Sequence, residues 1–308
     1  MANARQNIDK PGGGEEVSVR RSLPEAGRPI EKIAVLTMDS LFSTLYLEDY
    51  LAVHHRQVRL IMVSDYYGNG QFQGMVRKVW RTYRRSGFGL ANYYAFVCLY
   101  HRPALLLMNL INRLWRRPRR FRSIYQMGRD YGIPVQQVSC INDKAVEDHL
   151  RDLAPDLIQL TYFDQILREN IFSIPPMGCV NFHPGVLPDF RGPAASFWAM
   201  KRRGTSGLTL HYIDDTIDTG EILAIEEIGK GEQTSVLGMD YEIFRRAAGV
   251  TRKVYAAIES GEVEPRLQGQ RQIYDSFPDR QAIRESGLRL VTLRDFIRFF
   301  RFRGPDRE

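Results

Sequence analysis

The chain of 308 residues carries a formal net charge of +7, and its 44% hydrophobic and 26% charged residues are the proportions of an ordinary globular protein. This length can bury one full α/β domain plus an appendage. Its three cysteines lie far apart and lack the spacing of metal ligands, so we expect no disulfide framework, no metal site and, most simply, a cytoplasmic protein.

The first 29 residues are rich in glycine, proline and charge, and they show no apolar periodicity. We therefore expect residues 1–29 to be a disordered tail. Because the segment lacks the apolar core of a secretory signal, export is not indicated.

A strand, a helix and a second strand are expected next. Residues 33–36 form a short apolar run, residues 41–50 place apolar side chains at helical spacing, and residues 58–63 form a second run. This order is the βαβ unit of a doubly wound sheet. The turn after the first run contains no glycine, so a backbone cradle for a phosphate is missing and no dinucleotide cofactor is expected.

Residues 66–122 form a basic insert that contains two apolar runs, 88–100 and 104–108. Neither run reaches the roughly 20 residues that span a bilayer, so we do not expect a transmembrane helix. Three interpretations remain open: packed helices that extend the core, interfacial helices that make peripheral membrane contact through residues 77–122, and a nucleic-acid surface.

The remaining elements alternate between strands and helices. We expect a helix over 123–130, a helix N-cap at Asp143, and a final basic amphipathic helix near 293–302. The other expected elements are strands at 135–138 and 155–162, a hairpin of 208–213 with 222–225, and a helix from Thr234 and Ser235.

Asn181 and His183 follow an apolar segment that ends in Cys179 and Val180. If that segment is a strand, both polar side chains point to one face, because side chains alternate with period two. Pro184 removes a backbone donor, so the chain must leave the sheet directly after His183. The pair is therefore expected at the carboxyl end of a strand, where open α/β sheets place their ligands.

A second polar loop follows the 208–213 strand and ends in Asp218, Thr219 and Gly220. Gly220 allows a tight turn, so the Asp218 carboxylate can face His183. Asp214 and Asp215 of the same loop are expected to form the turn, and His211 is expected to pack near it. An amide, an imidazole and a carboxylate are groups suited to acyl transfer.

Five motifs appear in one order: Asn-x-His-Pro at 181–184, Leu-Pro, Arg-Gly, Gly-Leu-Thr-Leu-His at 207–211, and Asp-x-Gly at 218–220. This series resembles the folate-dependent formyltransferase family, which includes methionyl-tRNA, glycinamide ribonucleotide and sugar N-formyltransferases. The resemblance is strong over residues 156–223. The chain departs from the family pattern at Gly185, where serine is usual, and at Val186, where leucine is usual.

The resemblance implies an α/β Rossmann-like formyltransferase fold, with a mostly parallel doubly wound sheet, the helical basic insert and a small C-terminal extension. It assigns residues 30–230 to the catalytic domain and residues 231–308 to the C-terminal helix and extension. It implies that Asn181, His183 and Asp218 are catalytic and that 10-formyltetrahydrofolate is the formyl donor. The implied cofactor contacts are Phe163, Gln165, Ile166, Leu167, Asp214 and Asp215.

A small-molecule amine, such as an amino sugar or an amino acid derivative, is the acceptor that we favour. The tail after Glu264 is too short and irregular for the barrel domain that methionyl-tRNA formyltransferases use for tRNA. A methionyl-tRNA formyltransferase, with tRNA as partner, remains an alternative because the basic insert occupies the position of their tRNA-contacting loop. Formyltetrahydrofolate hydrolases resemble this chain in the same three residues, so hydrolysis also remains open, as does a non-catalytic scaffold. The oligomeric state is not indicated.

Overall fold

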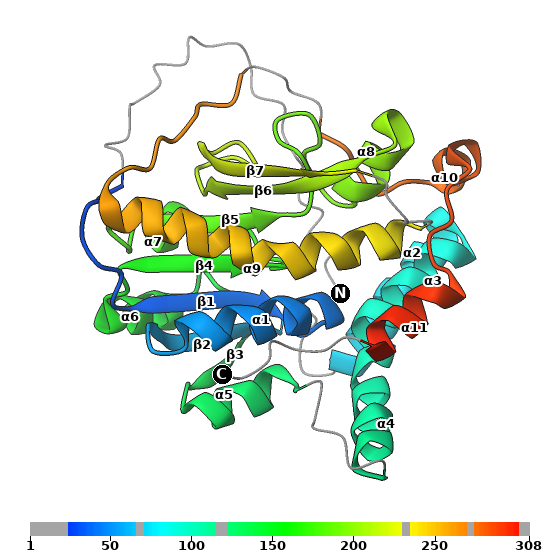
Figure 1. The fold of residues 1–308 in the computed structure, drawn as a ribbon, viewed down its shortest axis with the longest axis horizontal. Coiled ribbons are helices and arrows are strands. Elements are labelled where there is room, and N and C mark those ends of the chain that lie inside the picture. The colour runs from blue at the N-terminus through cyan, green and yellow to red at the C-terminus, as the bar shows by residue number, and fades with distance from the viewer. Residues whose placement is uncertain (1–23, 66–70, 115–121, 230–234, 270–273, 302–308) are drawn as a thin grey trace, which may run out of the picture.

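The computed structural model describes residues 24–65, 71–114, 122–229, 235–269 and 274–301, and within them a seven-stranded sheet with the order β3-β2-β1-β4-β5-β6-β7 (Figure 1). The strands are β1 (Ile33–Met38), β2 (Val58–Ser64), β3 (Val135–Val138), β4 (Leu157–Thr161), β5 (Cys179–His183), β6 (Ser206–Tyr212) and β7 (Ile222–Ile228). The helices are α1 (Leu41–His54), α2 (Gln71–Ser86), α3 (Phe88–Ala95), the π-helix η1 (Phe96–Tyr100), α4 (His101–Leu114), α5 (Ile124–Tyr131), α6 (Lys144–Leu153), α7 (Glu169–Phe172), α8 (Ala195–Arg203), α9 (Val236–Ser260), α10 (Arg280–Ser286) and α11 (Leu293–Arg301).

The sheet is parallel from β3 to β5 and antiparallel from β5 to β7. The predicted fold class, a mostly parallel α/β sheet with helices on its faces, is therefore confirmed. The first strand, the helix after it and the second strand lie where the apolar runs predicted them. The 208–213 hairpin is present as β6 and β7.

The larger hydrophobic core lies between the sheet and helices α1 and α9, which contact each other (Figure 1). Phe182 of β5 stacks on Tyr46 of α1 at 5.8 Å between ring centroids and meets Phe244 of α9 edge-on at 4.8 Å. Such ring pairs add to the free energy of simple apolar burial. A second core on the opposite face includes Cys179 of β5 and Leu150 of α6. Because Phe182 faces α1 and α9, its neighbours Asn181 and His183 face the other way.

Residues 24–29, shortly before β1, are held against the domain by hydrogen bonds. Arg28 donates to the Asp156 carboxylate at 2.8 Å, and the backbone N–H of Gly27 donates to the Ile258 carbonyl at 2.8 Å. Disorder was expected over all of residues 1–29, and for residues 24–29 this expectation is wrong, because these contacts tie the segment to the sheet and to α9. Residues 1–23 lie outside the described residues.

The described part of the basic insert consists of α2, α3, η1 and α4, which confirms a helical insert. The two apolar runs expected to be separate form one continuous helix, Phe88–Ile111, which is long and apolar enough to cross a membrane by length and composition. Within its most apolar stretch 41% is buried inside the protein. Leu90, Tyr93 and Val97 belong to the larger core, so this part of the helix is packed against the domain.

Arg122, at the end of the insert, is buried rather than solvated. Its guanidinium donates to both oxygens of Glu48, at 2.8 Å for the shortest contact, and to Asp130 at 3.0 Å. Arg122 can be buried because a buried carboxylate on α1, that of Glu48, pairs with it. Ser123 then caps α5 with a reciprocal capping box.

The C-terminal part of the chain shares the core of the sheet. Leu237, Phe244 and Tyr255 of α9 are buried against α1, so no break in the core follows the domain boundary expected at residue 230. Helix α11 lies near its expected range, and Phe296 contacts Phe96 of η1 at 4.4 Å between centroids.

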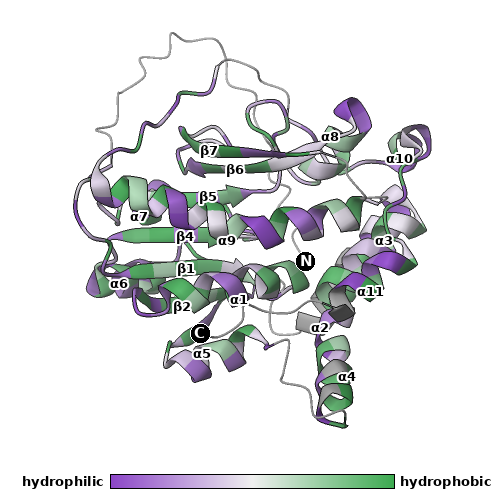
Figure 2. Ribbon diagram, in the orientation of Figure 1, coloured by the Kyte–Doolittle hydropathy of each residue, from purple (hydrophilic) through white to green (hydrophobic). Residues whose placement is uncertain are grey.

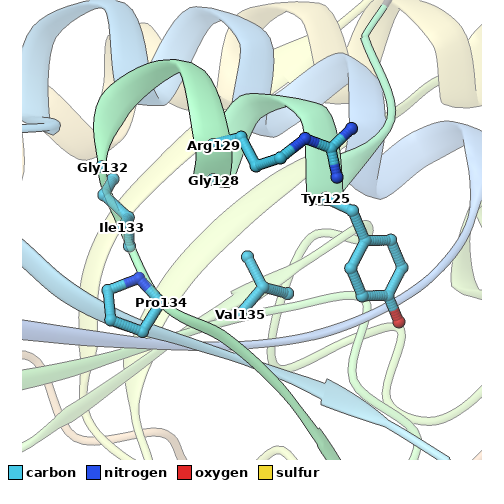
Figure 3. A pocket seen from close by; sticks show the side chains of 7 residues that line it. All are labelled: Tyr125, Gly128, Arg129, Gly132, Ile133, Pro134 and Val135. Atoms are coloured by element: carbon cyan, nitrogen blue, oxygen red, sulfur yellow. The ribbon is translucent and has the colours of Figure 1, made fainter.

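A shallow pocket lies between α5 and β3, at the outer edge of the sheet (Figure 3). It is lined by Tyr125, Gly128, Arg129, Gly132, Ile133, Pro134 and Val135. A Cβ on Gly128 would lie 2.3 Å from a methyl of Val135, so a glycine is required for β3 to approach α5. The pocket is remote from Asn181 and His183, because β2, β1 and β4 separate β3 from β5.

Replacing Arg122 should destabilise the protein strongly. Arg122→Ala would leave the Glu48 carboxylate buried without its main cation, which costs about 3 kcal/mol in comparable sites. Urea unfolding at neutral pH measures this loss. Arg129→Ala, an exposed arginine on α5, is the matched control and should change the free energy of unfolding by about 0.5 kcal/mol or less. Equal effects of the two substitutions would contradict the structural role of the Arg122 ion pair.

Candidate active site

Strand β5 places Asn181 and His183 on one face of the sheet, as the alternation predicted. Strand β6 runs antiparallel beside it, with Asn181 opposite His211 and His183 opposite Thr209. Residues directly opposite each other share a face, so His211 joins the pair. The Thr209 hydroxyl accepts from the Leu187 N–H at 3.0 Å and donates to the Gly185 carbonyl at 2.7 Å, which holds the turn that follows β5.

His211 is fully buried and neutral. Its Nδ1 lies 2.7 Å from the Tyr212 carbonyl, which can only accept, so Nδ1 carries the proton. Nε2 is then the acceptor of the Asn181 side-chain amide at 3.1 Å. Burial lowers the pKa of His211 to about 4, although the nearby Asp218 carboxylate opposes this shift. His211 therefore fixes the Asn181 amide in place and leaves its second N–H available.

The loop between β6 and β7 brings Asp218 against the same face. Its Oδ1 lies 3.7 Å from His183 Nδ1 and 3.9 Å from His211 Nε2, and its Oδ2 accepts from the Gly192 N–H at 2.9 Å. Gly220 is required for this turn, because a Cβ there would lie 1.9 Å from the Tyr212 carbonyl oxygen. Asp218 itself has φ +56°, a left-handed conformation that aspartate tolerates better than most residues. The amide, the imidazole and the carboxylate predicted from sequence thus lie together.

The carboxylate of Asp218 is held in its charged form. Burial by itself would raise its pKa, but attraction to His183 when that ring is charged, the Gly192 N–H and the Arg191 charge lower the pKa below its ordinary value. His183 is also oriented by the backbone, since its Nε2 donates to the Phe190 carbonyl at 2.8 Å. In the neutral ring Nδ1 is then unprotonated, and it is the nitrogen that faces Asp218.

Three residues lie beside Asp218, and two of them were not singled out from the sequence. The amide nitrogen of Gln268 donates to the carbonyls of Asp218 and Gly220, at 3.1 and 2.7 Å. Its amide oxygen accepts from Arg191 at 2.9 Å. Tyr274 pairs with Arg191 in an isolated bridge, and burial together with the Asp218 charge raises its pKa. The Arg-Gly motif marked Arg191, but nothing in the local sequence marks Gln268 or Tyr274, which lie roughly 50 residues further along the chain than Asp218.

Gly185 occupies a position without room for the serine that is usual in the family. A Cβ there would lie 2.6 Å from the Ala195 Cβ and 2.9 Å from His183 Nε2. Helix α8 and the imidazole therefore fill the space of that side chain. The glycine at position 185 therefore fits the space that Ala195 and His183 leave there.

The predicted cofactor contacts follow β4, in the loop next to β5. The side chain of Gln165 is used within the protein, since its oxygen accepts from the Ile141 N–H at 2.7 Å and its nitrogen donates to Ser64 at 2.9 Å. Leu167 is buried and Phe163 is partly buried in the second core, whereas 65% of Ile166 is exposed.

Asp214 and Asp215 belong to the β6–β7 loop. Asp214 accepts from the Thr216 N–H and the Thr219 hydroxyl, at 3.2 and 2.7 Å, so it forms the turn that carries Asp218. Asp215 is exposed. In the described part of the chain, no group of three or more His, Cys, Asp or Glu side chains could hold a metal ion.

Residues 132–236 match the family model described as formyl transferase. This part of the chain, which we call the matched domain, is similar to formyl transferases. The matched range includes Asn181, His183, His211 and Asp218, and it leaves the basic insert outside.

Among curated proteins, the chain is similar in part to methionyl-tRNA formyltransferases. The protein of Syntrophus aciditrophicus (strain SB) is 43% identical over 98 residues, which cover 32% of this chain and 31% of that protein. The protein of Myxococcus xanthus (strain DK1622) is 31% identical over 135 residues, 44% of this chain and 43% of that protein. The chain therefore spans less than half the length of these two relatives.

Two solved structures share the fold of most of this chain. Glycinamide ribonucleotide transformylase 1 from Symbiobacterium toebii superposes with a TM-score of 0.52 at 16% identity, over 81% of this chain and 96% of that one. A sugar N-formyltransferase from Shewanella sp FDAARGOS_354 superposes with a TM-score of 0.51 at 16% identity, over 87% and 86%. At these identities the likeness concerns the fold.

The buried His211 predicts a pH-dependent stability. Its pKa is about 4 when folded and near 6.5 when unfolded, so between these pH values the unfolded chain binds more protons. Stability should fall as pH drops from 6.5 to 4, by up to about 3 kcal/mol from this residue alone. Urea unfolding across that range measures the loss. His211→Gln should flatten the dependence, whereas His149→Gln, on the exposed side of α6, should leave it unchanged; the same slope in both variants would contradict the assignment.

Gln268 should hold the Asp218 loop closed. Gln268→Ala removes hydrogen bonds to the Asp218 and Gly220 carbonyls, and each bond is worth about 1 kcal/mol. Backbone hydrogen exchange in residues 214–220 should therefore accelerate by about tenfold or more. Gln281→Ala, on the exposed surface of α10, is the control. Unchanged exchange in the loop of Gln268→Ala would show that other contacts hold Asp218.

Proposed function

We propose that this protein is an N-formyltransferase that moves a formyl group from 10-formyltetrahydrofolate to the amine of a small-molecule acceptor. The observation that supports it is the convergence of Asn181, His183 and Asp218 around one space at the β5–β6 junction, with His211 fixing the amide. The match of residues 132–236 to the formyl transferase family supports the same chemistry.

The loop after β4 suits the pterin of the formyl donor. Both carboxylate oxygens of Asp164 are buried and have no hydrogen-bond partner within the described residues. Buried acceptors without partners are costly, and the amino and amide N–H groups of a pterin are donors that would satisfy them. The loop leaves β4 at the end where β4 pairs with β5, so a ligand bound there would lie next to the strand that carries Asn181. Ile166 and Phe163 would border it, Asp214 and Asp215 would close it from the β6–β7 loop, and Gln165 and Leu167 would support the loop from within.

The donor supplies the formyl carbon when it is bound. The acceptor nitrogen forms a bond to that carbon while the bond from the carbon to N10 of the folate breaks. One proton leaves the amine and one is delivered to N10, so charge and atoms balance. Asn181 donates its free amide N–H to the formyl oxygen, where negative charge develops, a contribution of about 3 to 4 kcal/mol in comparable sites.

His183 Nδ1 takes the proton from the attacking amine. This nitrogen is unprotonated in the neutral ring because Nε2 donates to Phe190. Asp218, at 3.7 Å and held ionised by its surroundings, stabilises the imidazolium that forms. The distance is that of an ion pair and not of a hydrogen bond, so the backbone carbonyl of Phe190, more than Asp218, orients the ring.

Methionyl-tRNA formyl transfer is the second candidate. The curated relatives of the domain carry that name, and residues 66–129 hold thirteen Arg and Lys side chains. One observation argues against this candidate. The described residues 274–301 contain two short helices, α10 and α11, and form no barrel. The small-molecule acceptor is therefore the proposal that we favour.

Asn181→Ala and Asp218→Asn should each lower turnover of 10-formyltetrahydrofolate by about 100-fold, with little loss of folded protein. Asn181→Ala removes the donor to the formyl oxygen, and Asp218→Asn removes the counter-charge of His183 without changing the shape of the side chain. Tetrahydrofolate release followed by absorbance measures turnover. Asp152→Asn, an exposed carboxylate on α6 outside the site, is the matched control. Near wild-type turnover in Asp218→Asn would overturn the assignment of roles.

The acceptor is identified by running this assay with amino sugar nucleotides, amino acid derivatives and methionyl-tRNA, and by detecting the formylated product by mass. A product with a small amine supports the proposal. Formylation of methionyl-tRNA alone would select the second candidate. Formate release that is independent of any added amine would identify a hydrolase.

A further inference from the structure

Helix α4 presents an apolar face to solvent. Leu107, Leu110, Ile111 and Leu114 are 53%, 54%, 39% and 71% exposed. They follow the i, i+3, i+4, i+7 spacing, so they form one stripe along the helix. Figure 1 shows α4 extending away from the sheet, and Figure 2 shows its hydrophobic colouring. We call these four residues the α4 stripe.

The opposite face of α4 fixes the helix to the domain. His101 and Leu105 are buried, at 2% and 6% exposure. His101 Nε2 lies 3.3 Å from the Asp39 carboxylate at the end of β1, and Arg102 also pairs with Asp39. Because α3 and η1 lead into the larger core, the helix cannot cross a bilayer while the domain stays folded. The α4 stripe therefore faces outward on a rigid support.

The positive charge of the protein is concentrated in the segment of the sequence that contains this helix. Residues 66–129 contain thirteen Arg and Lys side chains and no Asp or Glu. The other residues hold thirty basic side chains against thirty-six acidic ones, so without this segment the chain would be acidic. Among the described residues, Arg77, Arg81, Arg84 and Arg113 are exposed on α2 and α4.

We propose that the α4 stripe and the arginines around it dock the protein on the surface of an anionic lipid membrane. Leucine and isoleucine side chains enter the boundary between headgroups and acyl chains, and arginines pair with lipid phosphates. Exposed Trp80 and Tyr83, which stack on each other on α2, are residue types that favour the same interface. A nucleic acid would match the arginines but offers no partner for an aliphatic stripe. A second copy of the chain would bring the same positive charge against itself.

Vesicle co-sedimentation of the full chain tests this proposal. The wild-type protein should sediment with phosphatidylcholine vesicles that contain phosphatidylglycerol, and sediment much less with phosphatidylcholine alone. Added salt should weaken the binding. The triple variant Leu107→Gln, Leu110→Gln, Leu114→Gln should lower the partition coefficient by about tenfold or more. Leu267→Gln, which replaces a leucine that is 84% exposed elsewhere, is the matched control and should bind like the wild type.

The double variant Arg84→Glu, Arg113→Glu should reduce binding to anionic vesicles while leaving the stripe intact. If the triple variant fails to fold, the binding of this double variant tests the proposal instead. Equal binding of the wild type and both variants would overturn the proposal. Two other results would also overturn it, both with no vesicle binding by the wild type. In the first, the wild type is a dimer and the triple variant is a monomer. In the second, the wild type binds RNA and the double variant does not. Formyl transfer in solution should be unchanged in the triple variant, which separates this test from that of the proposed function.

Discussion

The register between β5 and β6 is the constraint on which the site depends. It sets Asn181 opposite His211 and His183 opposite Thr209, so an amide, two imidazoles and a hydroxyl share one face. A slip of one residue would turn His211 and Thr209 to the other side of the sheet and into the larger core. Strands β6 and β7 pair antiparallel as a hairpin, which requires no crossover helix between them. The loop from β6 to β7 can therefore fold back over this face and deliver Asp218.

Burial then decides the charges of these groups. A buried carboxylate is costly unless it has partners, and Asp218 has the Gly192 N–H at 2.9 Å and two imidazoles within 4 Å. His211 meets the opposite requirement, since its two ring nitrogens are satisfied by Tyr212 and Asn181 only when the ring is neutral. One fixed anion and one fixed neutral ring thus flank the single imidazole, His183, whose Nδ1 is free to exchange a proton. The polar groups are in place before any substrate binds.

Local patterns in the sequence predicted most of the strands and helices, and they singled out three residues that lie together in the candidate site. Apolar runs predicted the strands, and alternation with Pro184 predicted that Asn181 and His183 share a strand end. The role of His211 could not be predicted, because the pairing register of two strands is a property of the sheet and not of either strand. Gln268 reaches Asp218 from about 50 residues away, and no short-range signal encodes such a contact.

The insert shows a different limit of local patterns. Two separate apolar runs, 88–100 and 104–108, were expected on either side of Pro103, and a proline cannot donate to the carbonyl four residues before it. The chain instead continues as one helix because the π-helical turn Phe96–Tyr100, which contains Leu99, uses a wider hydrogen-bond spacing just before the proline. That continuity aligns α4 with the core-bound α3 and holds the α4 stripe away from the domain.

The family match and the charge distribution divide the chain in the same way. Residues 132–236 contain the amide, both imidazoles and the carboxylate, whereas residues 66–129, with all of the excess positive charge, lie outside that match. Asp39 joins the two parts at the carboxyl edge of the sheet, because it ends β1 and pairs with His101 and Arg102 at the start of α4. The residues of the candidate site and the exposed α4 stripe are thus carried by separate segments that pack on one sheet.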